Sequence, residues 1–205
     1  DAMSPAHVEA GRSIKNAVVN KSVMRKSTTE ADNQPFQWNV LSLRLPRLVE
    51  AHPRGQQVLH ILTTQTRPLW PETELEVPIA TLSSEMGAAL RSAHNAGHVV
   101  RSLESAEHML AAEERGLGLV DRHSGVPRGV RVSRLLVLAD DGAERFYRQV
   151  ERLLRRYGPR VLAVRLEADA DALGELLFGT NGRARLLMLN HKEAVSAFLL
   201  AMTDP

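Results

Sequence analysis

The sequence of 205 residues contains no cysteine and few aromatic residues, which make up 4% of the chain. Without cysteine the chain can form no disulfide, no thiolate zinc site and no cysteine nucleophile. It also has no apolar run long enough for a membrane span, so we expect no transmembrane helix. Because the N-terminus lacks the basic and then apolar pattern of a secretory signal, we expect an intracellular protein.

Lysine is also scarce, and only four of the 26 basic residues are lysines. The arginine guanidinium presents a planar fork of N–H donors that suits phosphates and base edges. A GC-rich genome favours arginine codons as well, so the excess by itself defines no function. Residues 1–67 carry nine basic and five acidic residues, and the remainder carries 17 and 19. The N-terminal third is therefore predicted to lie along a polyanion.

Apolar spacing predicts two parts, a basic N-terminal arm and docking extension over residues 1–82 and a domain over residues 83–205. In the first part, helical spacing at 55–62 and an extended segment at 74–79 are expected. In the second part, strands alternate with helices, and residues 116–131 are expected to form a loop. The predicted strands are 99–100, 135–139, 161–166 and 186–189. This order predicts an α/β fold, a three-layer α-β-α sandwich with a small mixed four-stranded sheet plus the N-terminal extension.

Residues 85–192 resemble the kink-turn-binding ribosomal protein superfamily in the order of their elements. The matching pieces are the alanine-rich helix 86–96, the turn 97–102, the helix 103–110, the strand ending Leu138-Ala139-Asp140-Asp141, the strand 161–164 and the segment 172–179. The resemblance implies a non-catalytic RNA-binding or scaffolding subunit of a ribonucleoprotein particle. Its expected partners are structured RNA and other protein subunits, and no cofactor, metal or catalytic residue is expected.

The resemblance also implies where RNA would bind. RNA-binding members carry a glycine, an Asn-Glu pair and a lysine at the start of the second helix. In this chain Ser102 stands for the glycine, Glu104 and Ser105 stand for the pair, and His108 stands for the lysine. Glu104 repels phosphate and His108 is a weaker cation than lysine, so the chain departs from the kink-turn pattern. The predicted contacts on this edge are Arg101, Ser102, Glu104, Ser105 and His108.

A second predicted contact is the loop before the last strand, with Asn181, Arg183 and Arg185. Its Asn-Gly pair is typical of a tight turn, which would either serve the fold alone or present the two arginines. The predicted arm contacts are Arg12, Lys15, Lys21, Arg25 and Lys26. Residues 33–38 resemble the N-terminal region of ribonuclease P and MRP protein subunits. This resemblance implies RNA processing, including tRNA processing, and a nuclear or nucleolar location.

Two other functions compete with RNA binding. The first is a protein-interaction adaptor of the growth-arrest and DNA-damage-inducible type, since residues 104–106 are similar to that branch. The second is a receiver-like phosphoacceptor domain that uses Asp140 and Asp141, although these carboxylates also suit the start of the following helix. No histidine pair has metal-ligand spacing on one helix, because Gly97 interrupts the only candidate. The polar side of the helix 146–157 carries Arg152, Arg155 and Arg156 and is predicted to be a solvated face.

Overall fold

The computed structural model describes residues 43–124 and 130–204, and for residues 121–124 it describes the backbone only. The helices are α1 (Arg47–Glu50), α2 (Gly55–Thr64), α3 (Ser84–Asn95), α4 (Leu103–Ser124), α5 (Glu144–Tyr157), α6 (Ala170–Phe178) and α7 (Lys192–Ala201). The strands are β1 (Thr66–Pro68), β2 (Glu76–Ala80), β3 (Val99–Arg101), β4 (Arg134–Leu138), β5 (Val161–Leu166) and β6 (Leu186–Leu189). None of these helices combines the length and the apolar character that a membrane span requires.

The strands form one mixed sheet in the order β1-β2-β5-β4-β6-β3. Strands β2, β5 and β4 run parallel to one another, whereas β6 is antiparallel to β4, β3 is antiparallel to β6 and β1 is antiparallel to β2. The four predicted strands are all present. The sheet has six strands rather than four, because β1 and β2 extend it beyond β5.

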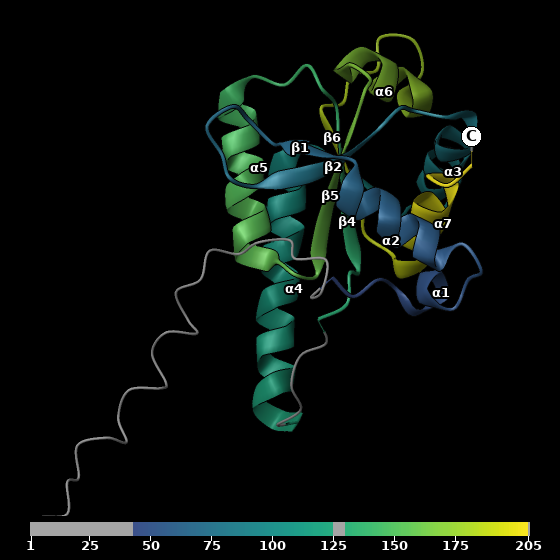
Figure 1. The fold of residues 1–205 in the computed structure, drawn as a ribbon. Coiled ribbons are helices and arrows are strands. Elements are labelled where there is room, and N and C mark those ends of the chain that lie inside the picture. The colour runs from purple at the N-terminus through teal and green to yellow at the C-terminus, as the bar shows by residue number, and fades with distance from the viewer. Residues whose placement is uncertain (1–42, 125–129, 205) are drawn as a thin grey trace, which may run out of the picture. The chain divides into compact units, whose positions relative to one another are not determined.

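The sheet separates two layers of helices, which confirms the α/β sandwich (Figure 1). Alternate residues of β4 point to opposite faces, as the pleat of a strand requires. Leu135 and Val137 lie in a core cluster with residues of α1, α2, α3, α6 and α7. Leu136 and Leu138 lie in a second cluster with residues of α4 and α5. The continuous apolar run of this strand is therefore explained by burial on both faces.

Residues 43–82 contribute to the same sheet and the same core as the residues that follow them. Val49 and Val58 are fully buried in the cluster on the α7 side of the sheet. In the sheet, Ile79 of β2 pairs with Arg165 of β5. The predicted boundary at 82/83 falls in the connection between β2 and α3. Residues 1–42, with the predicted arm contacts Arg12, Lys15, Lys21, Arg25 and Lys26, lie outside the described residues.

Helix α4 corrects the prediction of a loop over residues 116–131, because the helix continues from Leu103 to Ser124. A single glycine inside a helix costs only about 1 kcal/mol relative to alanine, so Gly116 does not end it. Buried ion pairs attach the helix to the sheet. Glu113 accepts from Arg134 at 2.8 Å and lies 3.7 Å from Arg160, and all three side chains are at least three-quarters buried.

Helix α5 carries a second buried carboxylate, Glu151. This carboxylate holds the connection between β1 and β2 against α5. The indole N–H of Trp70 donates to Glu151 Oε2 at 2.5 Å, and the Arg155 guanidinium donates to Oε1 at 2.9 and 2.6 Å. Burial raises the pKa of Glu151, but the hydrogen bonds from Trp70 and Arg155 outweigh this effect. The net result is a pKa below the ordinary value of 4.5.

We expect Glu151→Gln to lower the free energy of unfolding at neutral pH. Because the pKa of Glu151 is lower in the folded chain than in the unfolded chain, its carboxylate stabilises the fold above the unfolded pKa. This contribution is lost as the pH falls through the folded pKa. The difference in stability between wild type and variant should be largest above about pH 5 and should shrink on acidification. Urea unfolding across this pH range measures it, with the exposed Glu193→Gln as control. A difference that does not change with pH would contradict the expectation.

Candidate functional site

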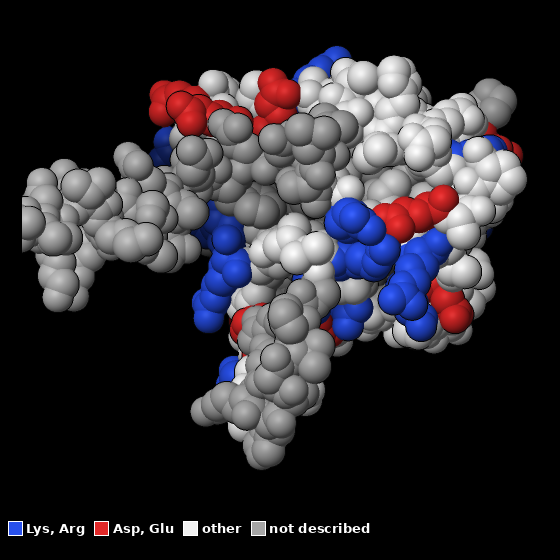
Figure 2. Space-filling view, turned by 60° about the horizontal axis from the view of Figure 1, so that its bottom comes forward, with Lys and Arg blue, Asp and Glu red and all other residues white. Residues whose placement is uncertain are grey.

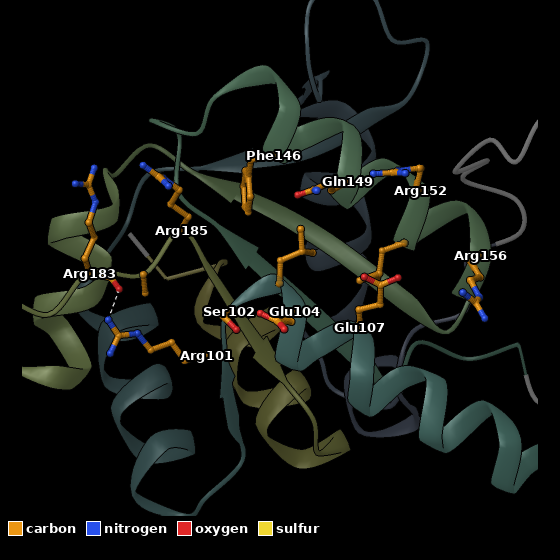
Figure 3. Close-up of a pocket in the computed structure, with 13 residues that line it drawn as sticks. Arg101, Ser102, Glu104, Glu107, Phe146, Gln149, Arg152, Arg156, Arg183 and Arg185 are labelled. Carbon is orange, nitrogen blue, oxygen red and sulfur yellow. Dashed lines mark hydrogen bonds between the residues drawn. The ribbon is translucent and has the colours of Figure 1, made fainter.

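A groove of about 830 Å³ lies on the surface of the described residues. Three segments form it: the start of α4, one face of α5 and the chain that leads into β6 (Figure 3). The residues that line it are Arg101, Ser102, Leu103, Glu104, Glu107, Phe146, Gln149, Arg152, Leu153, Arg156, Arg183, Ala184 and Arg185. Five of the thirteen are arginines, so we call this site the arginine groove.

The sheet topology explains why these three segments meet. Because β6 is antiparallel to both of its neighbours, the start of β6 lies beside the ends of β3 and β4. Backbone hydrogen bonds hold the three together there. The Ser102 N–H donates to the carbonyl of Leu186 at 3.2 Å, and the Ala139 N–H donates to the carbonyl of Arg185 at 3.0 Å. Helices α4 and α5 follow β3 and β4, so both begin at this end of the sheet.

Ser102 makes the turn from β3 into α4, with a positive φ of 82°. Glycine adopts this region without strain, whereas serine rarely does. The Ser102 hydroxyl oxygen accepts from the N–H of Ser105 at 3.3 Å, as an N-cap does, and lies 3.1 Å from the Ser105 hydroxyl. Both predicted serines therefore shape the start of α4, but only Ser102 lines the groove.

The loop before β6 is held against α6 by a contact between two backbones. A Cβ atom on Gly174 would lie 2.4 Å from the backbone nitrogen and Cα of Arg183, so no side chain fits there. Asn181, with φ 73°, makes the tight turn that its Asn-Gly pair predicts, and the Gly182 N–H donates to the carbonyl of Gly179 at 2.8 Å. This turn serves the fold and also places Arg183 and Arg185 in the groove.

Two of the groove arginines are held by other groups. Arg183 contacts two carboxylates, Asp141 at 3.3 Å and Asp171 at 3.4 Å. The guanidinium of Arg101 lies 4.5 Å from the ring centre of Phe178 and donates to the carbonyl of Arg183. These contacts fix the end of the groove that lies at the α6 side of the sheet.

The other groove arginines are less constrained. The guanidinium of Arg156 lies 5.2 Å from the ring centre of Tyr157. Within residues 43–124 and 130–204, Arg152 and Arg185 have no carboxylate within salt-bridge distance. Their N–H donors are therefore available to a ligand. On the face of the molecule drawn in Figure 2, basic and acidic side chains lie next to one another.

The structure brings together five of the eight predicted contacts of the domain. Arg101, Ser102, Glu104, Arg183 and Arg185 line the arginine groove, whereas Ser105, His108 and Asn181 do not. Sequence reasoning missed the contribution of α5, which supplies Phe146, Gln149, Arg152, Leu153 and Arg156. Their spacing of three to four residues was the available signal, since it marks one helix face beside the buried Tyr147 and Val150. The polar side of this helix was predicted to be a solvated face. Two of its arginines, Arg152 and Arg156, line the groove, and Arg155 does not.

The acidic pair after β4 has a structural role that differs from the expected one. Asp141 accepts from the Ala170 N–H at 3.0 Å and from Arg183 at 3.3 Å, so it satisfies the first amide of α6, whose N-cap is Asp169. The pair precedes Ala143, the N-cap of α5, by two and three residues and makes no cap hydrogen bond to that helix. Among the described side chains, no three His, Asp or Glu residues are placed to hold a metal ion.

Comparisons with known proteins add little to this geometry. No protein-family model and no curated protein sequence matches the chain. One matching solved structure is described as a protein with unknown function from Bacillus halodurans C. It shares 15% sequence identity with the chain, and the match covers 60% of this chain and 100% of that chain with a TM-score of 0.36. A similarity at this level does not define a shared fold.

Two glycine substitutions test how the loop before β6 is positioned. Gly174→Ala should lower the free energy of unfolding by about 1–3 kcal/mol, because the new methyl group must displace the backbone at Arg183. Gly116→Ala is the matched control. It also replaces a helical glycine, but nothing lies within 4 Å of its Cβ position, so helix propensity alone should raise stability by up to about 1 kcal/mol. Urea unfolding of both variants measures this. Equal effects of the two substitutions would refute the proposed contact.

Proposed function

We propose that this chain is a non-catalytic RNA-binding and scaffolding subunit of a ribonucleoprotein particle, and that it holds RNA in the arginine groove. The observation that carries the proposal is the set of five arginines that line one groove, of which Arg152 and Arg185 are free to bind. Arginine is the side chain best suited to phosphate, because its planar fork donates two parallel hydrogen bonds. Most contacts of nucleic-acid-binding proteins go to phosphate and sugar.

The resemblance to the kink-turn-binding superfamily supports the same proposal from an independent direction. The position at which that family has glycine is Ser102, and Ser102 adopts the φ value that glycine favours. The family's RNA-binding edge corresponds to residues 101–108, and the first part of this edge lines the groove. A particle of the ribonuclease P/MRP type in the nucleus or nucleolus is part of this proposal, and the arm of residues 1–42 would add contacts there.

A protein-interaction adaptor is the second candidate. The observation in its favour is the exposed apolar surface of Leu119 and Val120 near the end of α4, with 54% and 58% of these residues accessible. This surface lies outside the arginine groove. Substitutions at the two places therefore separate the two functions.

The charge of the groove can be tested with two double variants of equal net charge. We expect Arg152→Ala with Arg185→Ala to weaken RNA binding about tenfold or more, because two phosphate contacts are lost. The control is Arg145→Ala with Arg91→Ala, which removes two exposed helical arginines outside the groove. Fluorescence anisotropy of the full chain with a labelled RNA hairpin measures the Kd.

The salt dependence gives a second readout of the same experiment. Each lost phosphate contact lowers the slope of log Kd against log salt concentration by about 0.7–0.9. The groove variant should therefore show a slope reduced by about 1.4–1.8, whereas the control should keep most of the wild-type slope. If both double variants weaken binding equally, net charge and not the groove is responsible, and the proposed site is wrong. If the wild type binds no RNA, the adaptor function is favoured.

A further inference from the structure

The arginine groove contains two carboxylates between its basic ends. Figure 3 shows Arg101, Arg183 and Arg185 at one end and Arg152 and Arg156 toward the other. Glu104 and Glu107, from the start of α4, lie between these two groups. Both glutamates are exposed, and within the described residues neither has an ion-pair partner. The middle of the groove therefore carries negative charge, while its ends carry positive charge.

This arrangement limits what can cross the groove. A line of phosphates that ran the whole length of the groove would pass the two carboxylates and be repelled by them. Phosphates are favoured only at the ends, so the part of a ligand that faces the middle must be neutral and must offer N–H donors to Glu104 and Glu107. A nucleobase meets both conditions when its edge is free.

The side chains opposite the carboxylates suit a base as well. Phe146 projects from α5 toward the middle of the groove and is only partly buried. The accessible part of an aromatic ring can stack on any base, and such stacking contributes about 1–3 kcal/mol in single-stranded complexes. Gln149, one turn further along α5, adds an amide that both donates and accepts. In a duplex the base edges are paired and the faces are stacked, so these contacts require an unpaired strand.

We propose that the arginine groove takes an unpaired RNA segment, stacks one base on Phe146 and reads an exocyclic amino group of that base with Glu104 and Glu107. This proposal rests on the proposed function and specifies its substrate. Carboxylates accept from the N4 amino group of cytosine. Uracil has a carbonyl oxygen at the same position, and that oxygen faces a carboxylate unfavourably. Cytosine is therefore favoured over uracil.

The first test compares three RNAs of equal length with the full chain: oligo(C), oligo(U) and a blunt duplex. We expect oligo(C) to bind about tenfold more tightly than oligo(U), the ratio that one hydrogen-bonded base contact supports, and more tightly than the duplex. Oligo(C) with N4,N4-dimethylcytosine keeps the stacking surface but has no N4–H donor, and it should bind like oligo(U). Equal Kd values for oligo(C), its dimethyl form and oligo(U) would overturn the assignment of the carboxylates.

The second test changes the two carboxylates. Glu104→Gln with Glu107→Gln should bring the ratio of Kd values for oligo(U) and oligo(C) close to one, because an amide can donate to the uracil carbonyl. The same variant should bind oligo(U) more tightly than the wild type, since two negative charges are removed. The control is Glu85→Gln with Glu193→Gln, which also removes two carboxylates, here from the first turns of α3 and α7 and outside the groove. It should leave the ratio unchanged, and a ratio that both variants change equally would contradict the proposal.

These tests separate the failure of this inference from the failure of the proposed function. Suppose that the wild type binds oligo(C) and oligo(U) equally, and that the double variant Arg152→Ala with Arg185→Ala lowers the affinity for both to the same extent. RNA binding in the groove then stands, and base reading is wrong. If the duplex binds as tightly as either single strand, the requirement for an unpaired segment is wrong. If none of the three RNAs binds, both proposals fail.

Discussion

The structure depends on the burial of β4 between a parallel neighbour and an antiparallel one. Each residue from Leu135 to Leu138 pairs with both β5 and β6, so the strand has no free edge. Its alternate side chains enter the two core clusters, so both layers of helices attach to this strand. Full burial of a strand on both faces requires an unbroken apolar sequence, and charge appears only at the two ends, at Arg134 and Asp140.

The same pairing creates the arginine groove. An antiparallel β6 brings the start of one strand beside the ends of two others, and the helices that follow those two strands begin at the same place. Loops and helix starts at the carboxyl ends of strands are where open α/β sheets usually bind ligands. Asp141 and Gly174 then complete the geometry, because the first pairs with Arg183 and the second allows its backbone to approach α6. The strand order thus determines where the groove lies, and the contacts of Asp141 and Gly174 determine how Arg183 is positioned in it.

The strands from β3 onward and most helices could be predicted because their apolar periods and caps are local in the sequence. Strand β2 falls on the extended segment expected at 74–79, but its place in the sheet could not be predicted, because Pro78 interrupts its pattern. Strand β1 has only three residues and is recognisable only by its pairing with β2. The part of the groove from α5 was missed for a similar reason. Periodicity shows that Arg152 lies away from the core, but it does not show that α4 lies beside that face.

The mixed charge of the groove separates affinity from selectivity. Arg101 and Arg183 are held by Phe178, Asp141 and Asp171, so part of the cost of ordering them is met before any ligand binds. Arg152 and Arg185 are not held in this way and can adapt to a ligand. Glu104 and Glu107, which lie between these arginines, repel every polyanion. Only a ligand that donates hydrogen bonds to the two carboxylates offsets this repulsion. Repulsion of this kind makes a binding site selective, because it acts against the many ligands that attraction alone would accept.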